Sequence, residues 1–347
     1  MVNPQETVSL GNVKQANELR DHPVFICGHP KAGTSLLRAV LDSHPQLVVY
    51  PEETMFFRRT LPQLEGQDLE AQLKLAERNL IHIFHWSRTE PDPSQAGFTD
   101  RDYSSIPYNE VRNKLEELAK LRSNHPGDLL SAAVLAYGIA AGALYSEKRH
   151  WVEKSPYNEY FADQIFSWWP EARCLHILRD PRDNFNSYRR KHPNWNAEFF
   201  SSNWSRSTEA GINNQKNFGA DRYWFVRFED LARSPEEYLS ALAIFLDINW
   251  DPSLINPTRA GQQWGGNSMF EDQFQSISTA PLYRWKDSLS QVDAEVITLM
   301  TKRLLRTWDY PIDNNRQLGT QLVARFRSFS WPVRRPFYHR RKASLAN

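Results

Sequence analysis

The sequence predicts an α/β fold in which a central parallel sheet is flanked by helices and carries a helical insertion. Three observations support this. Short apolar runs alternate with helical segments, the first run leads through a Gly/Pro loop into a helix, and residues 60–148 are mostly helical. Such alternation is typical of βαβ units. The 347 residues, 40% hydrophobic and 24% charged, have an ordinary globular composition and can bury a sizeable core.

The first elements lie close together near the N-terminus. The apolar run Val24–Cys27 ends at Gly28 and predicts a buried strand followed by a loop. Ser35–Ser43 has apolar residues at helical spacing, which predicts a helix after that loop. Leu47–Tyr50 predicts a second short strand, which Pro51 ends. The order is therefore strand, loop, helix, strand.

The insertion at residues 60–148 contains three predicted helices. Leu69–Phe84 and Val111–Leu121 are amphipathic, whereas Leu129–Tyr145 is rich in Ala and Leu and is expected to be buried. Thr89–Pro107 is rich in Pro, Ser and Asp and predicts a loop between them. We expect this block to lie over the sheet.

Strands and helices alternate again after the insertion. The predicted strands are Trp151–Val152, Ala172–Leu178 and Tyr223–Phe228. The predicted helices are Asp183–Arg190, Pro235–Phe245 and Val292–Thr307. We therefore divide the chain into an N-terminal extension (1–20), one main domain (21–312) that includes the insertion, and a basic, aromatic C-terminal tail (313–347).

The charge pattern bears on the partners of the protein. The net charge of +1 does not favour nucleic acid binding. From Asn314 onward there is no Asp or Glu, while eight Lys and Arg residues accumulate among aromatic side chains. We expect a solvated, partly frayed end, with peripheral contact to an anionic surface, either membrane or acidic glycan, as the alternative. The charge pattern does not indicate which oligomeric state the protein has.

The cysteines and the N-terminus bear on the compartment. Cys27 and Cys174 each lie in an apolar run and are expected to be buried, reduced thiols. No metal-ligand spacing is present, so no metal site is predicted. The N-terminus lacks the apolar core of a signal peptide, and no stretch reaches the roughly 18 apolar residues that span a bilayer. These features predict a cytoplasmic protein.

The loop between the first strand and helix predicts an anion site. A helix N-terminus exposes unpaired N–H groups with partial positive charge, and small residues there allow an anion to approach. Gly33 permits close backbone approach, Thr34 and Ser35 add hydroxyl donors, and Lys31 adds a cation. The fold is therefore P-loop-like. It departs from the Walker A pattern GxxxxGK[ST], because Thr34 stands where that pattern requires Lys.

A second anion-binding element follows the strand that ends at Leu178. Arg179 offers a planar fork of donors to a phosphate, and Ser187 offers a hydroxyl eight positions later on a helix. By itself, an Arg at a strand end also suits a salt bridge with a neighbouring Asp. The two elements in this order make a phosphate site the favoured interpretation.

The two motifs together resemble those of sulfotransferases that use 3′-phosphoadenosine 5′-phosphosulfate (PAPS). The segment Pro30–Ser35 is similar to the family's 5′-phosphosulfate loop, which implies donor contacts from Lys31, Ala32, Gly33, Thr34 and Ser35. The resemblance also implies that Arg179 and Ser187 hold the 3′-phosphate. It extends over about residues 22–310.

Three weaker matches and one departure refine the resemblance. Glu153–Pro156 is similar to a segment of glycan-type and bacterial sulfotransferases, and Val226–Leu231 to a common strand motif. Asn267–Phe270 and Tyr283–Lys286 resemble the late segment that folds over the nucleotide, which implies that Arg284 and Trp285 bind the donor. Leu36 replaces the adenine-stacking Trp of the cytosolic small-phenol branch. The chain therefore looks closer to the glycan- and protein-modifying branch.

The resemblance also implies a catalytic base. Sulfuryl transfer needs a group that takes the acceptor proton and cations that hold the developing charge. The motif position favours Glu53 as base, although ungapped counting from Lys31 permits Glu52. Lys31 and Lys154 would neutralise the transferring group. His82 and His85, in the insertion, are further candidates because the cytosolic branch uses a His.

The predicted function is sulfuryl transfer from PAPS to an acceptor hydroxyl by in-line displacement. The acceptor is a hydroxyl-bearing molecule, with a glycan as one candidate. An ATP-dependent P-loop kinase is the alternative from another reaction class, and it would need a Mg²⁺ site. A nonenzymatic protein that binds anions or glycans is the third interpretation, and it would not need Glu53.

Overall fold

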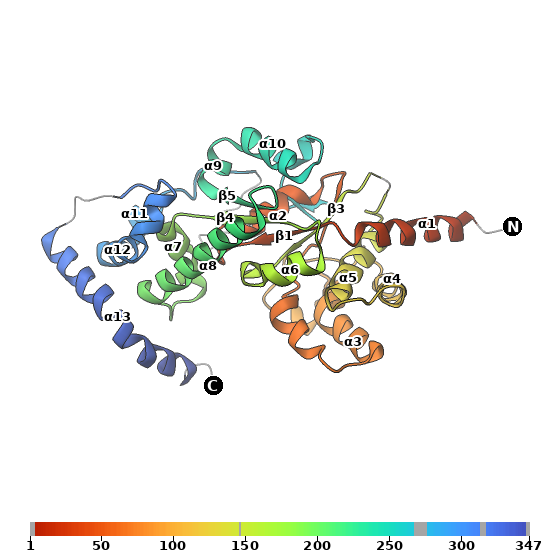
Figure 1. Cartoon of the computed structure of the whole chain (residues 1–347), viewed down its shortest axis with the longest axis horizontal. Helices are drawn as coiled ribbons and strands as arrows, with labels where there is room; N and C mark the ends of the chain where they lie inside the picture. Colours follow the sequence, from red (N-terminus) through yellow and green to blue (C-terminus); the bar gives the residue numbers. More distant parts are fainter. Residues whose placement is uncertain (1–3, 146, 267–275, 313–316, 345–347) are drawn as a thin grey trace.

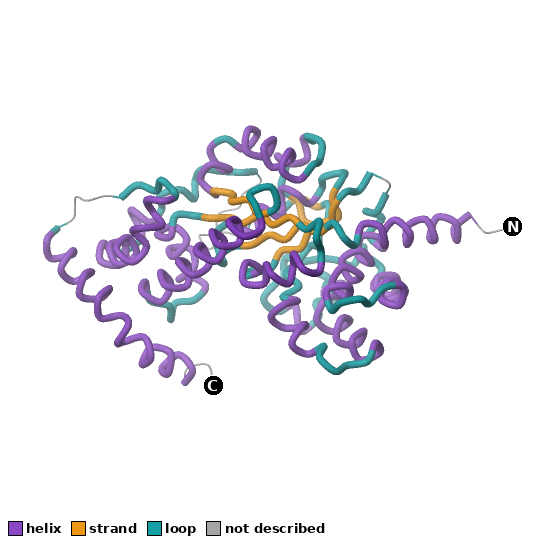
Figure 2. The backbone as a smooth tube through the Cα atoms, viewed as in Figure 1, coloured by secondary structure: helices purple, strands orange, loops and turns teal. Residues whose placement is uncertain are grey.

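A five-stranded parallel sheet forms the centre of the chain (Figure 2). The computed structural model describes residues 4–145, 147–266, 276–312 and 317–344. The strand order is β2-β3-β1-β4-β5. The strands are β1 (Pro23–Cys27), β2 (Leu47–Val49), β3 (His150–Lys154), β4 (Arg173–Leu178) and β5 (Tyr223–Arg227). The predicted α/β fold, with its parallel sheet and five strands, is confirmed.

The sheet order determines which loops can meet. Strand β1 pairs with β3 on one side and β4 on the other, so that Ile26 lies opposite Lys154 and Leu175. The carboxyl ends of parallel strands lie at one edge of a sheet, where open α/β folds bind their ligands. The loop after β1 therefore lies between the ends of β3 and β4.

The two faces of the sheet are covered by different helices. Successive side chains of a strand point to opposite faces. Val24 and Ile26 pack in a core with α2 (Thr34–Asp42) and α10 (Pro235–Leu246). Phe25 and Cys27 pack in the other core, which includes the insertion and α8 (Ala197–Phe218). Both faces are therefore covered, as a parallel sheet requires.

The predicted helical insertion lies over one face of the sheet (Figure 1). Helix α3 (Leu69–Ala76) continues through a π-helical turn (Glu77–Ile81) into a 3-10 turn (His82–His85). Helices α4 (Tyr108–Leu121) and α5 (Gly127–Ala140) follow, so the third predicted helix ends five residues early. The short elements of this region are Phe56–Thr60 (π), Leu61–Gln63 and Pro93–Gln95 (both 3-10).

The N-terminal residues belong to the fold. Helix α1 (Pro4–Leu19) contacts α4 and α5. The fully buried Arg20 donates hydrogen bonds to the carbonyl oxygens of Leu118 (2.8 Å) and Asp128 (2.7 Å). The C-terminal part of α1 is thus packed against the insertion, with Val13, Ala16 and Leu19 buried.

The C-terminal half contains several further helices, of which only the two at Asp183–Arg190 and Val292–Thr307 had been predicted. They are α6 (Ala162–Trp168), α7 (Pro181–Lys191), α9 (Phe228–Arg233), α11 (Trp285–Ser288), α12 (Gln291–Thr307) and α13 (Leu318–Ser344). Short elements are the 3-10 turns Asn158–Phe161 and Pro252–Ile255 and the antiparallel pair β6 (Thr258–Arg259) and β7 (Gln262–Gln263).

The expectation of a frayed C-terminal tail is corrected by α13. This helix contacts α12 and α8. In the described part of the chain, no helix combines the length and the apolar character that a membrane crossing needs. Both cysteines are buried and free, as expected.

Candidate active site

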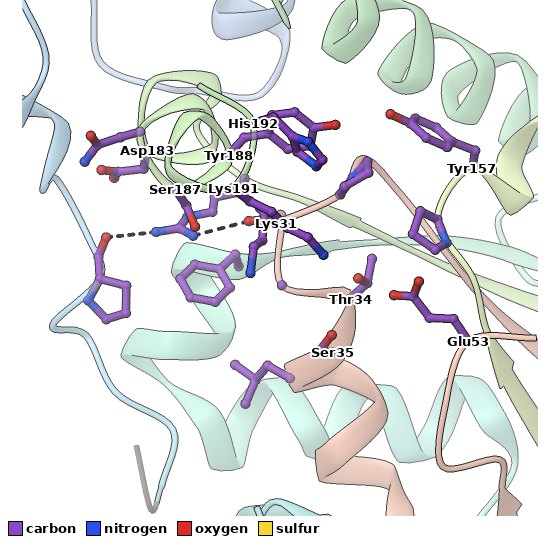
Figure 3. A pocket seen from close by; sticks show the side chains of 18 of the residues that line it. Lys31, Thr34, Ser35, Glu53, Tyr157, Asp183, Ser187, Tyr188, Lys191 and His192 are labelled. Atoms are coloured by element: carbon purple, nitrogen blue, oxygen red, sulfur yellow. Dashed lines mark hydrogen bonds between the residues drawn. The ribbon is translucent and has the colours of Figure 1, made fainter. Parts of the chain in front are cut away.

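A pocket of about 430 Å³ lies beyond the carboxyl ends of the strands, within the size of small-molecule sites, roughly 300–1,000 Å³. It is formed by the loop after β1, the loop after β2, α7 and the segment that precedes α11 (Figure 3). Eight of the predicted site residues line it: Lys31, Gly33, Thr34, Ser35, Glu53, Arg179, Ser187 and Arg284. The structure therefore brings together residues from segments far apart in sequence.

The phosphate loop requires glycine at two positions. Gly28 and Gly33 have φ angles of +124° and +113°, which L side chains rarely adopt. A Cβ at Gly33 would lie 2.6 Å from the Phe228 ring, and one at Gly28 would lie 2.5 Å from the Ile177 carbonyl oxygen. Helix α2 then begins at Thr34 without a side-chain cap. The N–H groups of its first turn are thus directed at the pocket.

Ala32 has a different place in this loop. Its N–H donates to the His29 carbonyl oxygen at 3.1 Å, and its side chain is buried outside the pocket lining. Asn184 supports the same turn by donating to the Pro30 carbonyl oxygen at 2.9 Å. Ala32 therefore shapes the loop, and its own amide is already used.

The pocket is electropositive around Lys31. Burial, together with the neighbouring Lys191, Lys154 and Arg179, lowers the pKa of Lys31 to about 8, while Glu53 opposes the shift. An anion that binds beside Lys31 would offset the cost of burying its charge and would stabilise the protonated ammonium. This arrangement suits a polyanionic ligand.

Arg179 links the phosphate loop to the segment before α11. Its guanidinium donates to the carbonyl oxygens of Lys31 (3.3 Å) and Pro281 (3.0 Å) and lies 4.5 Å from the centre of the Phe228 ring. The side chain is almost fully buried at the pocket wall. Ser187, on α7, lines the same pocket, so the structure brings the two predicted residues together.

Asp183 was not predicted from the sequence. Its carboxylate accepts hydrogen bonds from the backbone N–H groups of Tyr283 (2.6 Å) and Trp285 (2.9 Å). Burial raises the pKa of Asp183 to about 6, against the opposing effect of Arg179. Asp183 thus holds the segment that carries Arg284 against the pocket.

Spacing along α7 could have revealed further lining residues. Asp183, Ser187 and Lys191 follow one another at intervals of four and therefore share one face of the helix. All three line the pocket, together with Tyr188 and His192 (Figure 3).

Glu53 lies in the pocket opposite the phosphate loop (Figure 3). Lys154, at the end of β3, forms an ion pair with the Glu53 carboxylate and donates to the Ser35 hydroxyl at 3.3 Å. The Lys154 side chain is 4% exposed, whereas that of Glu53 is 41% exposed. Lys154 therefore joins the carboxylate to the anion site, and Glu53 stays accessible.

The buried Glu153 positions the loop that carries Glu53. Its carboxylate accepts from the Thr54 hydroxyl (2.7 Å), the Ser155 hydroxyl (2.6 Å) and the Asn158 amide (2.7 Å). Ser155 in turn accepts from the Met55 N–H at 2.8 Å. The Glu-Lys-Ser segment at the end of β3 thus anchors the residues on the C-terminal side of Glu53.

Glu52 points into a different environment. Its carboxylate accepts from the Arg101 guanidinium (2.6 Å) and the Tyr103 hydroxyl (2.7 Å), outside the pocket lining. Burial opposes ionisation, but the nearby guanidiniums, above all that of Arg101, lower the pKa of Glu52. Its role is to pair with buried cations.

The histidine candidates lie elsewhere. His82 contacts Ser94 and Asp92, His85 packs on the Tyr108 ring, and neither lines the pocket. His29 is buried beneath the loop against Phe200, and burial lowers its pKa to about 4. His29 thus packs beneath the loop, where its Nδ1 lies 3.0 Å from the Pro30 carbonyl oxygen.

The position of Trp285 does not support the predicted contact with the donor. Its buried ring lies 4.3 Å from the Arg182 guanidinium, outside the pocket lining. Leu36, Phe228 and Trp264 line the pocket instead. Trp264 had no motif to mark it. The matching segment Asn267–Phe270 lies outside the described residues.

Comparisons with known proteins agree with this geometry. Residues 23–252 match the model of the sulfotransferase family. A protein-tyrosine sulfotransferase of Drosophila melanogaster is 22% identical over 74% of this chain and 44% of its own length. Protein-tyrosine sulfotransferase A of Caenorhabditis elegans is 26% identical over 67% of this chain and 52% of its own length. The chain thus spans about half the length of these relatives.

A solved structure supports the fold. The sulfotransferase domain from the curacin biosynthetic pathway superposes with a TM-score of 0.51 at 17% identity, over 84% of this chain and 99% of that domain. The agreement concerns the arrangement of sheet and helices.

Proposed function

This chain belongs to the sulfotransferase family, and from that premise we propose that it transfers the sulfuryl group of PAPS to an acceptor hydroxyl. The observation that carries the proposal is the convergence of Lys31, Ser35, Glu53, Arg179 and Ser187 on one pocket. The cations and hydroxyls suit the phosphates of the donor, and the exposed carboxylate of Glu53 suits proton removal.

The donor would bind along the wall formed by α2 and α7. The first-turn amides of α2, with Thr34, Ser35 and Lys31, would hold the 5′-phosphosulfate. Arg179 and Ser187 would hold the 3′-phosphate. Phe228 and Trp264 are the aromatic side chains in the lining from which a base contact is expected.

The transfer would proceed by in-line displacement at sulfur. Glu53 would take the proton of the acceptor hydroxyl while its oxygen bonds to sulfur and the bond from sulfur to the 5′-phosphate oxygen breaks. The electron pair of that bond would remain on the phosphate oxygen, where Lys31 and Lys154 stabilise the added charge. Because Lys154 contacts both Glu53 and Ser35, it can shift from the carboxylate to the donor when the donor binds.

Two acceptor classes remain as candidates. The sequence suggested a glycan hydroxyl. A tyrosine hydroxyl within an acidic peptide is favoured by the names of the similar proteins and by Arg58 and Arg59, which are exposed at the pocket near Glu53. Arginines at this place would attract either an acidic peptide or an acidic glycan.

Two measurements test the proposal together. Adenosine 3′,5′-bisphosphate should raise the melting temperature, since a ligand present at about 100 times its Kd adds about 2.7 kcal/mol to stability. Adenosine 5′-phosphate should stabilise less at equal concentration, because it lacks the group for Arg179. Labelled PAPS should then transfer label to at least one member of a panel of sugars and tyrosine peptides.

Two outcomes would contradict the proposal. Equal stabilisation by ATP that depends on Mg²⁺ would favour a kinase. Binding of the bisphosphate without transfer to any acceptor, and without hydrolysis of PAPS, would favour a protein that only binds anions.

A further inference from the structure

The C-terminal helix α13 is fixed to the body of the protein by one of its faces. On this face Ala324 and Trp331 are buried, and the Trp331 indole donates to the Ser202 hydroxyl at 2.9 Å. Arg327 donates to Glu198 (2.8 Å) and Asp293 (2.9 Å), and Arg334 donates to Glu198 (2.7 Å). These bonds set the rotation of α13 about its axis.

The opposite face of α13 is apolar and exposed. Five side chains follow one another at intervals of four, four, three and four residues, so they form one stripe along the helix. This apolar stripe consists of Leu318 (74% exposed), Leu322 (58%), Phe326 (72%), Phe329 (92%) and Val333 (72%). At 3.6 residues per turn it lies on the far side from Ala324 and Trp331.

This arrangement inverts the usual one. A surface helix normally buries its apolar stripe and exposes its polar side, whereas α13 uses arginines to bind the body and directs its large apolar side chains outward. Single exposed apolar residues need no explanation, but a contiguous stripe marks an interaction surface. Figure 1 shows α13 along the outer edge of the molecule, and the side chains of the stripe are exposed there.

We propose that the apolar stripe of α13 docks the protein on an anionic membrane surface. The charge pattern selects this partner. There is no Asp or Glu from Asn314 to the C-terminus, and the sequence continues past the stripe with Arg340, Arg341 and Lys342. Arg325 is exposed and lies beside the stripe, three positions after Leu322 and four before Phe329. Cationic residues beside an apolar stripe are typical of helices that lie in the headgroup region of anionic bilayers.

The same charges disfavour a second copy as the partner. Stripe-to-stripe pairing of two chains would bring two acid-free, arginine-rich segments together, and like charges at short distance repel. An anionic surface instead accepts the arginines while the apolar side chains enter it. The described helices include none that would cross the bilayer, so the helix would lie on the surface.

Co-sedimentation of the full chain with vesicles tests the proposal. The protein should bind to vesicles of mixed phosphatidylserine and phosphatidylcholine. It should bind far less to vesicles of phosphatidylcholine alone. Phe326→Ser combined with Phe329→Ser should weaken binding by about tenfold or more. Arg325→Gln should weaken it by about fivefold, since a basic residue near the surface contributes about 1 kcal/mol.

A matched control separates the stripe from general surface apolarity. Ile244 on α10 is 81% exposed and lies outside the stripe, so Ile244→Ser should leave vesicle binding unchanged. The melting temperature should hardly change in any of these variants, because the replaced side chains are exposed.

Three results would overturn the proposal. The first is absence of binding to the anionic vesicles. The second is binding that the two Phe substitutions leave intact. The third is a dimer in size-exclusion chromatography that the Phe substitutions abolish while vesicle binding persists, which would assign the stripe to a second copy.

Discussion

Lys31 combines an unusual backbone with an unusual charge environment. Its φ angle of +67° lies in the left-handed region, which non-glycine residues adopt at a cost. The Arg179 guanidinium bonds its carbonyl oxygen and helps to hold this conformation. The pKa of its ammonium is lowered to about 8, chiefly by burial. Backbone geometry at this residue therefore places an ammonium group with a lowered pKa in the pocket.

The lowered pKa of Lys31 predicts how donor binding depends on pH. A bound polyanion favours the protonated form, so binding near pH 8 should take up a proton. Affinity for adenosine 3′,5′-bisphosphate should therefore fall as pH rises above about 8, by up to about tenfold per pH unit. Calorimetry in buffers of different ionisation enthalpy measures both the uptake and the affinity.

The variant Lys31→Arg should abolish this pH dependence, because a guanidinium does not titrate in the range. Lys191→Arg, in the same pocket, should leave it in place. A slope that persists in Lys31→Arg would assign the titration to another group.

The adjacent acids Glu53 and Glu52 should differ sharply in function. Glu53→Gln keeps the size of the side chain but removes its basicity, so turnover should fall by about 10²–10⁴. Affinity for the bisphosphate should stay level or rise, since a negative charge near a polyanion is removed. Steady-state kinetics and calorimetry check the two parts.

Glu52→Gln is the matched control. It weakens the bonds from Arg101 and Tyr103, so stability should fall by about 1–3 kcal/mol while turnover per folded molecule is retained. Loss of turnover at Glu52 and not at Glu53 would reassign the base. Unchanged turnover in both variants would remove the acidic pair from the mechanism.

At the scale of elements, helix α7 organises one side of the pocket. Its residues at four-residue spacing include an acid, a hydroxyl and a cation, namely Asp183, Ser187 and Lys191. The hydroxyl and the cation line the pocket, whereas the acid accepts hydrogen bonds from two backbone amides of another segment. One helix face thus both lines the pocket and holds the segment around Arg284 in place.

The variant Asp183→Asn tests this positioning role. An amide is a weaker acceptor for the N–H groups of Tyr283 and Trp285, so hydrogen exchange at these two amides should accelerate. Affinity for the bisphosphate should fall by about three- to tenfold, roughly the effect of losing one net hydrogen bond. Asp287→Asn, exposed on the same segment, should change neither quantity. Exchange that stays at the wild-type rate would contradict the role.

At the scale of the whole molecule, the sheet order assembles the pocket. Because β1 lies between β3 and β4, the phosphate loop meets Lys154 on one side and Arg179 on the other. These residues lie more than a hundred positions from Lys31 in the sequence. A different order of the same strands would separate them.

Packing between distant segments also explains why α8 and the C-terminal tail were wrongly predicted. Helix α8 was missed because its Ser-, Asn- and Thr-rich sequence has low helix propensity; its stability comes from packing, with Gly211 set closely against His176. The tail was expected to fray, since basic sequences without acids are usually solvated. Glu198, in α8, instead binds Arg327 and Arg334 and holds α13 in place.

The sequence by itself determined the local features. The apolar runs, Gly28 and Gly33, and the strand-loop-helix order predicted the sheet and its anion loop, because each depends on residues close together in the chain. The motif around Arg179 and Ser187 was local in the same sense. These parts of the fold and pocket were therefore predictable.

Only the tertiary structure decided which side chains reach the pocket. Glu52 and Glu53 are neighbours with the same chemistry, yet Arg101 and Tyr103 bind one while the other faces the phosphate loop. Trp285 matched a motif but packs under Arg182, and Trp264 lines the pocket without a motif. The physical reason is that side-chain direction depends on partners from distant segments, and local sequence carries no information about those partners.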